Sequence, residues 1–273
     1  MQTFSIGIIG AGNMGLALAA GLAAGMGPER IAVSDRHPDK QQRIRDLGIT
    51  AHADNDPVIA HADLLVLAVK PQGLRDLCGA IAQGVQNRRP VVISVAAGIR
   101  GTDIERWLGG GLSVVRAMPN TPALINAGVS ALWANARTTP AQRQAAAAVL
   151  AAVSEVFWLE NEALMDAATA ISGSGPAYFF LMVEALTAAG TAMGLPRDVC
   201  AALAAGTAAG AGRMVHDHPG EAAQLRARVT SPGGTTERAI KSLLDNGFME
   251  MCAHATQAAQ LRARELGEQW GAA

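Results

Sequence analysis

The chain has 273 residues, a formal net charge of −1, and 22 basic against 23 acidic residues with no basic block. This balance argues against a nucleic-acid surface and a polybasic membrane patch, so we expect small molecules and further copies of the chain as partners. Hydrophobic residues make up 50% of the chain, but charged residues interrupt the apolar stretches, and we predict no membrane span. The length predicts two domains.

The first segment with a recognisable function runs from Ile6 to Gly15. Isoleucines predict a short strand, the glycines have GxGxxG spacing, and residues 16–25 continue as a helix. This order is typical of a dinucleotide-binding loop, in which the helix N-terminus binds the pyrophosphate. The cofactor residues predicted in this loop are Ile9, Gly10, Ala11, Gly12, Asn13 and Met14.

Strands then alternate with helices or loops. Apolar, β-rich runs lie at 31–35, 63–69, 91–97, 113–118 and 129–135, a helix is predicted over 140–155, and residues 157–160 are a candidate last strand. This alternation predicts an α/β fold, a Rossmann-type doubly wound parallel sheet, over residues 1–160 as an NAD(P)-binding domain.

After residue 160 only helices are predicted. They cover 176–194, 196–215 and 235–247, followed by a last helix to about residue 266. Residues 161–273 therefore form an all-helical domain. Small residues recur at Ala202, Gly206 and Gly210, and this spacing fits packing within the chain as well as a subunit interface.

The end of the second predicted strand carries Ser34, Asp35 and Arg36. Asp35 can accept hydrogen bonds from the adenosine ribose of NADH and would repel the 2′-phosphate of NADPH. Arg36 can instead pair with that phosphate or stack on adenine. A surface salt bridge between the two neighbours is the third possibility, so the sequence leaves NADPH against NADH open.

Three polar stretches rich in glycine or proline remain, at 116–123, 172–178 and 231–236. In the last of them, Ser231, Gly233, Gly234, Thr235 and Thr236 can direct backbone N–H groups and hydroxyls at one point, which suits a carboxylate. Helix caps without a ligand are the alternative.

Taken together, GAGNMG, AVKP, AAG, AMPNTPA, SGSGPAY and SPGGTT resemble the pyrroline-5-carboxylate reductase family in their order along nearly the whole chain. The resemblance implies reduction of 1-pyrroline-5-carboxylate to L-proline with NADPH or NADH, the last step of proline biosynthesis. It also implies that the helical domains pair into a homodimer, with a decamer of dimers as a further assembly.

The resemblance assigns residues as well. It implies that Thr236, the catalytic residue of this prediction, hydrogen-bonds the substrate ring nitrogen. Ser231, Gly233, Gly234 and Thr235 match the carboxylate-binding loop. Further cofactor contacts are implied at Asn55, Ala68, Val69, Lys70, Pro71, Val95, Ala96 and Ala97. A solvated lysine at the end of a strand is the alternative for Lys70.

Two regions depart from the family pattern. In the first, the spacer 221–230 looks a few residues longer than usual, and Arg228 stands where the family more often has an amide or a small polar residue. The second is Asp35, near which many relatives carry a hydroxyl or a small polar residue, so the resemblance does not fix a preference for NADPH.

A β-hydroxyacid dehydrogenase would use a lysine from its helical domain, and no lysine lies between Lys70 and Lys241. A protein that binds NAD(P)H without turnover would not need the loop 231–236, which suits a carboxylate.

The remaining observations concern location and metals. The three cysteines form no CxxC pair and the N-terminus shows no signal peptide, so we predict a cytoplasmic protein without a disulfide framework. His216 and His218 have no third ligand at the spacing of a known metal-binding motif, and we predict no metal site.

Overall fold

The computed structural model describes residues 4–271, which divide into two compact units. The sheet unit contains residues 4–174 and 259–271, and the helical unit is Gly175–Ala258. The sheet unit thus extends past residue 160, because residues 161–174 and the last part of the C-terminal helix pack with it. The domain limits 1–160 and 161–273 stay a prediction.

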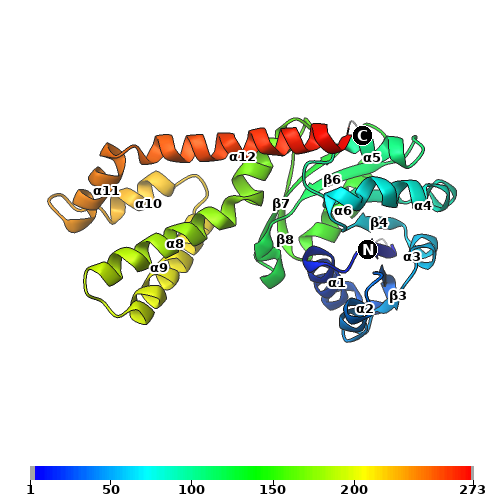
Figure 1. Ribbon diagram of the computed structural model, residues 1–273, viewed down its shortest axis with the longest axis horizontal. Coiled ribbons are helices and arrows are strands. Elements are labelled where there is room, and N and C mark those ends of the chain that lie inside the picture. The colour runs from blue at the N-terminus through cyan, green and yellow to red at the C-terminus, as the bar shows by residue number, and fades with distance from the viewer. Residues whose placement is uncertain (1–3, 272–273) are drawn as a thin grey trace. The chain divides into compact units, whose positions relative to one another are not determined.

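An eight-stranded sheet forms the centre of the sheet unit, in the order β3-β2-β1-β4-β5-β6-β7-β8 (Figure 1). The strands are β1 Ile6–Ile9, β2 Ile31–Ser34, β3 Thr50–His52, β4 Leu64–Leu67, β5 Val91–Ser94, β6 Val114–Met118, β7 Gly128–Ala134 and β8 Ser154–Trp158. The order of the first six is that of dinucleotide-binding folds. This confirms the predicted fold class, while β3 was not predicted from the sequence.

One pair of strands departs from the predicted parallel arrangement. β7 runs antiparallel to β6, and all other neighbours are parallel. The connection from Met118 to Gly128 is shorter than the dozen or so residues that a parallel crossover needs. The chain therefore turns back beside β6. The helix predicted over 140–155 ends at Ala151, because residues from Ser154 onward enter β8.

Helices cover both faces of the sheet, and alternate strand residues pack against them. Ile6, Ile8 and Val66 belong to a core that includes residues of α1 and α6, whereas Leu65 and Leu67 pack with residues of α3, α4 and α5. The helices of this unit are α1 Asn13–Met26, α2 Pro38–Arg45, α3 Asp56–His61, α4 Leu74–Arg88, α5 Gly101–Trp107, α6 Pro140–Ala151 and α7 Leu164–Ala168, with a π-helical turn at Thr169–Gly173. Buried on both faces, the central strands can be apolar throughout.

The helical unit contains α8 Gly175–Ala192, α9 Arg197–Asp217, α10 Ala222–Arg228, α11 Thr235–Asp245 and the first part of α12 Phe248–Gly271. α8 and α9 lie side by side as an antiparallel pair (Figure 1). α10 was not predicted, and α12 continues beyond the predicted end at residue 266. Within residues 4–271, we find no helix with the length and apolar character that crossing a membrane requires.

Candidate active site

The glycine loop lies between β1 and α1 at the carboxyl end of the strand. Gly10 has φ of +101°, its N–H donates to the carbonyl of Ser34 at 2.8 Å, and a side chain there would meet the carbonyl oxygen of Ala68 at 2.7 Å. A Cβ on Gly15 would collide with the carbonyl of Gly10. Both positions therefore require glycine for the fold itself.

Gly12 differs from these two glycines. A Cβ added there would meet no atom within 4 Å, so the fold alone does not demand glycine at this position. Gly12 precedes α1, whose first turn carries no acidic residue, and the first N–H groups of a helix have no intrahelical partner. The loop thus presents open space and free N–H groups together, which fits a pyrophosphate.

The end of β2 is linked to the glycine loop through Asp35. One carboxylate oxygen accepts the N–H of Ala11 at 2.9 Å and lies 3.3 Å from Nζ of Lys40, and the other accepts the N–H of His37 at 3.0 Å. The Asp35 side chain is only 8% exposed. Burial raises the pKa of Asp35, but the hydrogen bonds from His37 and Ala11 and the charge of Lys40 outweigh it and lower this pKa below its usual value.

Arg36 does not pair with Asp35, so the salt bridge between neighbours that the sequence allowed does not form. Its Nε lies 3.2 Å from Nε2 of His37, and the residue is exposed. The ionic partner of Asp35 is Lys40, in the first turn of α2. Neither Lys40 nor His37 was singled out in the sequence, although a proline at the start of a helix two residues beyond Arg36 signals this turn.

The other predicted cofactor segments lie at the same edge of the sheet. Ser34 Oγ donates to Oδ1 of Asn55 at 2.8 Å, and the N–H of Ala68 donates to the carbonyl of Ile9 at 2.8 Å. Val95 donates to the carbonyl of Leu67 at 3.2 Å. Lys70 is exposed and precedes a turn at Pro71–Gly73. The structure therefore brings the ends of β1, β2, β4 and β5 together with Asn55.

The predicted substrate loop lies in the helical unit, at the start of α11. Gly233 has φ of +71°, its N–H donates to a carboxylate oxygen of Glu237 at 2.8 Å, and the N–H of Gly234 donates to the carbonyl of Ser231 at 3.0 Å. Among residues 4–271, the hydroxyls of Thr235 and Thr236 have no hydrogen-bond partner. The loop keeps free hydroxyls beside a helix N-terminus, and Glu237 is a neighbour that the sequence analysis missed.

The spacer before this loop is mostly helical. α10 covers Ala222–Arg228 and buries Leu225. Arg228 lies 3.4 Å from a carboxylate oxygen of Glu221, with both side chains well exposed to solvent. Most of the spacer 221–230 is thus helical.

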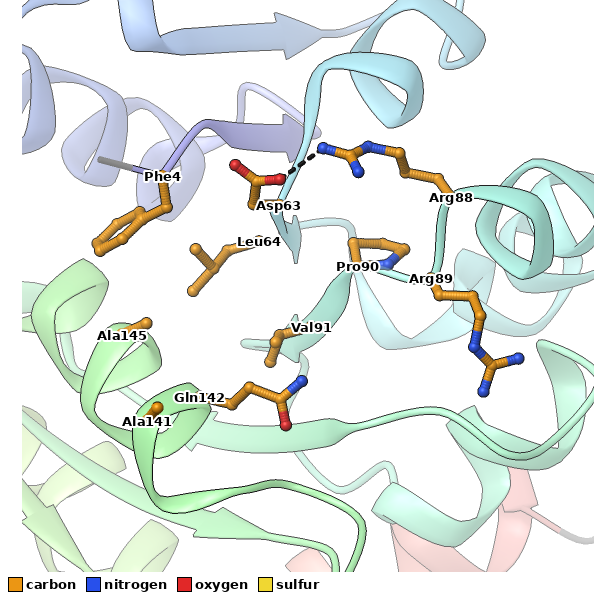
Figure 2. Close-up of a pocket in the computed structure, with 10 residues that line it drawn as sticks. All are labelled: Phe4, Asp63, Leu64, Arg88, Arg89, Pro90, Val91, Ala141, Gln142 and Ala145. Carbon is orange, nitrogen blue, oxygen red and sulfur yellow. Dashed lines mark hydrogen bonds and ion pairs between the residues drawn. The ribbon is translucent and has the colours of Figure 1, made fainter. Parts of the chain in front are cut away.

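A cavity of about 550 Å³ lies at the opposite edge of the sheet (Figure 2). Its lining includes Asp63 and Leu64 at the start of β4, and Pro90 and Val91 at the start of β5. Figure 2 shows Arg88 directed at Asp63, with which it forms an ion pair at 2.5 Å. Ligands of doubly wound folds bind at the carboxyl ends of the strands, so this cavity is not the candidate active site.

Two family models match the chain. A model described as pyrroline-5-carboxylate reductase dimerisation covers residues 162–266, and one described as NADP oxidoreductase, coenzyme F420-dependent, covers residues 5–98. A pyrroline-5-carboxylate reductase of Pseudomonas aeruginosa is 46% identical over 99% of this chain and 100% of the relative. The chain belongs to the pyrroline-5-carboxylate reductase family.

Solved structures of pyrroline-5-carboxylate reductases are similar as well. The enzyme of Coxiella burnetii has a TM-score of 0.93 and 39% identity, covering 97% of this chain and 99% of the other. The enzyme of Plasmodium falciparum, with NADP bound, has a TM-score of 0.82 and 30% identity, covering 98% and 99%. The predicted family, the fold class and the class of NAD(P)H-dependent oxidoreductase are confirmed.

The helical unit also explains the dimerisation match. Large apolar side chains of this unit are more than 60% exposed in the single chain, among them Phe179, Phe180, Leu181, Met193 and Met249. Exposed apolar surface of this extent marks an interaction site. The dimerisation domain indicates a homo-oligomer.

Proposed function

We propose that this chain reduces 1-pyrroline-5-carboxylate to L-proline with NADPH or NADH, as the last step of proline biosynthesis. The observation that carries the proposal is the relationship over almost the whole chain to reductases of this name. The open space at Gly12 and the free hydroxyls of the loop 231–236 support it, because both fit the chemistry that such a reductase needs.

The cofactor would lie along the carboxyl edge of the sheet. The N–H groups of Gly12, Asn13 and Met14 hold the pyrophosphate. The adenosine half lies on the β2 side, and the nicotinamide half on the side of β4 and β5. The residues in contact on these two sides are Ser34, Asp35, Arg36 and Asn55, and then Ala68, Val69, Lys70, Pro71, Val95, Ala96 and Ala97.

The substrate is a cyclic imine that carries a carboxylate. Ser231, Gly233, Gly234 and Thr235 bind the carboxylate through hydroxyl and N–H groups, and the Thr236 hydroxyl hydrogen-bonds the ring nitrogen. The dihydronicotinamide supplies the hydride that adds to the carbon of the C=N bond. A threonine hydroxyl does not titrate in the working pH range, so Thr236 orients the imine, and the proton on nitrogen comes from solvent or arrives with the substrate.

Assembly is part of the same proposal. The helical unit pairs two copies into a homodimer, supported by its exposed apolar side chains, and a decamer of dimers is the further assembly. Light scattering tests both, and a fully active monomer would contradict them. The cytoplasmic location is supported by three free cysteines, since a reducing compartment keeps thiols reduced. The domain limits 1–160 and 161–273 complete the proposal.

The test is oxidation of NADH and of NADPH, measured in parallel on addition of racemic 1-pyrroline-5-carboxylate, with proline detected as the product. We expect turnover with at least one cofactor, and Thr236→Ala lowers it while cofactor affinity stays near that of the wild type. Ser242→Ala is the matched control, because it removes an exposed hydroxyl from the same helix α11. A chain that binds cofactor but forms no proline would refute the proposed reaction.

A further inference from the structure

The segment after β5 borders the place that the proposed function gives to the cofactor, and the inference rests on that function. In the strand order β3-β2-β1-β4-β5, the adenosine half of a dinucleotide lies on the β2 side of the glycine loop. The nicotinamide half therefore lies beside the ends of β4 and β5. The residues that directly follow β5, from Val95 to Arg100, form the platform for that half, and we name them the nicotinamide platform.

Open space borders this platform. A cavity of about 470 Å³ is lined by Gly98 and Arg100 of the platform, by Arg116 and Glu162, and by Gly267 of α12. A backbone segment beside a cavity is not held by dense packing on that side. Ala96 and Ile99 anchor the platform in the core of the sheet unit, so the contacts made near its end hold the side that borders the cavity.

The first of these contacts joins the backbones of Gly98 and Gly267. Gly98 has φ of +79°, and a Cβ there would lie 3.4 Å from Cβ of Leu266. A Cβ on Gly267 would lie 2.6 Å from the carbonyl oxygen of Gly98, a backbone atom that can move only with the platform. Only glycine at position 267 allows α12 to approach this closely. The C-terminal end of α12 lies beside α5 (Figure 1), where Arg106 donates to the carbonyl of Gly271 at 2.7 Å.

The second contact fixes the residue that follows the platform. The N–H of Gly101 donates to Oε1 of Glu162 at 2.6 Å, and the same oxygen accepts from Arg116 at 2.9 Å. The side chains of Arg116 and Glu162 are 5% and 18% exposed. Gly101 begins α5, so Glu162 satisfies one of the N–H groups that a helix start leaves free and ties it to β6.

We propose that Gly267 and Glu162 are positioning residues for the nicotinamide half of the cofactor, acting through Gly98 and Gly101. Neither touches the cofactor. Gly267 of α12 sets how closely this helix approaches Gly98, and Glu162 holds Gly101, the residue after the platform, against the sheet. The adenosine half binds at the glycine loop and β2, which these two residues do not contact.

The test compares cofactor fragments with whole cofactors. Calorimetry measures the affinity of 2′,5′-ADP, ADP, NADPH and NADH for Gly267→Ala, for the wild type, and for Gly79→Ala as the matched control. Gly79 lies in α4 with no atom within 4 Å of an added Cβ, so the same substitution there leaves the platform untouched. We expect Gly267→Ala to change the affinity for the fragments by less than about twofold and to lower the affinity for NADPH and NADH several-fold. We also expect it to lower kcat about tenfold, because small displacements of reacting groups are costly.

Two results would overturn the inference for Gly267. One is a lower melting temperature with whole-cofactor affinity and kcat unchanged, since that is the mark of a purely structural contact. The other is an equal loss for fragments and whole cofactors, since the effect is then not confined to the nicotinamide half. If the wild type binds no fragment at all, the proposed cofactor site fails, and the inference fails with it.

Glu162 is tested by a pair of substitutions. Glu162→Gln keeps an oxygen for the N–H of Gly101 and removes the charge opposite Arg116, whereas Glu162→Ala removes both. We expect both variants to melt earlier, and only Glu162→Ala to lose whole-cofactor affinity several-fold. Asp166→Asn is the control, because Asp166 lines the same cavity from α7. Equal losses of cofactor affinity in the two Glu162 variants would overturn the positioning role.

Discussion

Asp35 provides a sharp test of how the adenosine end of the cofactor is recognised. Its two oxygens accept the N–H groups of Ala11 and His37, and one lies against Lys40. With 8% of the side chain exposed, little of the carboxylate remains for the ribose. We therefore expect Asp35 to serve the shape of the glycine loop more than the cofactor. The perturbation is Asp35→Asn.

The magnitude follows from these contacts. An asparagine amide has one oxygen, so its NH₂ group must face one of the two backbone N–H donors, and that donor loses its partner. An unsatisfied buried donor costs about 1–3 kcal/mol, and the ion pair with the partly exposed Lys40 adds at most about 1 kcal/mol. A loss of about 2 kcal/mol lowers the Tm by about 4–8 °C in a domain of this size.

The effect on cofactor use separates the two roles of Asp35. A carboxylate that held both ribose hydroxyls would contribute two charge-assisted hydrogen bonds, about 3–6 kcal/mol, and its loss would lower kcat/KM for NADH more than 100-fold. We expect kcat/KM for NADH to fall less than about tenfold in Asp35→Asn, and kcat/KM for NADPH to fall no further than that. The assays are kcat/KM for both cofactors and thermal unfolding. Asp39→Asn is the control, because Asp39 is an exposed acid of the same α2.

The pH dependence of stability checks the same reasoning. The pKa of Asp35 is lower in the folded chain than its usual value of 3.8, so the carboxylate stabilises the fold above that value. This contribution is lost as the pH falls through the lowered folded-state pKa. The stability difference between wild type and Asp35→Asn should be full at pH 7 and should shrink below about pH 4. A large loss confined to NADH, with an unchanged Tm, would refute the reasoning.

Further predictions concern both units. Thr236→Ala should lower kcat by about 10- to 100-fold, the loss of one oriented hydrogen bond of about 1–3 kcal/mol, with cofactor affinity unchanged in a fluorescence titration. Glu237→Gln should lower KM for the anionic substrate about two- to fivefold in initial-rate assays, because it removes a negative charge beside the carboxylate-binding loop. Arg36→Gln should weaken the binding of 2′,5′-ADP by about tenfold and the binding of 5′-AMP by much less in a calorimetric titration, since only 2′,5′-ADP carries the 2′-phosphate. Burial raises the pKa of Cys78 to about 12, so a maleimide at pH 8 should leave this thiol unmodified until the chain unfolds.

The cofactor edge was predictable because its signals are local in sequence. Gly10, Gly12 and Gly15 lie between a strand and a helix, and the apolar strand runs recur at intervals that fit a doubly wound fold. The direction of β7 was not predictable from composition, because it depends on the length of the connection from Met118. β3 and α10 are short elements with weak periodicity, which the pattern does not distinguish from loops.

Side-chain partners were harder to predict than elements. Asp35 stood out because of its position after β2, but its pairing with Lys40 rather than Arg36 depends on the turn into α2. Glu237 was overlooked because an acid in the first helical turn is common. Predicting its contact with Gly233 required the left-handed conformation of that glycine, which sequence spacing does not reveal.

The support of the nicotinamide platform is the least local part of the site. Gly98 follows β5 and Gly267 lies in α12, so their contact joins distant parts of the chain. α12 begins in the helical unit, shortly after the loop 231–236 and α11, and ends in the sheet unit. The predicted substrate loop and a contact that limits the nicotinamide platform are therefore connected by α11 and α12. Position 267 therefore requires glycine, because any side chain there would move the carbonyl of Gly98 and, with it, the platform.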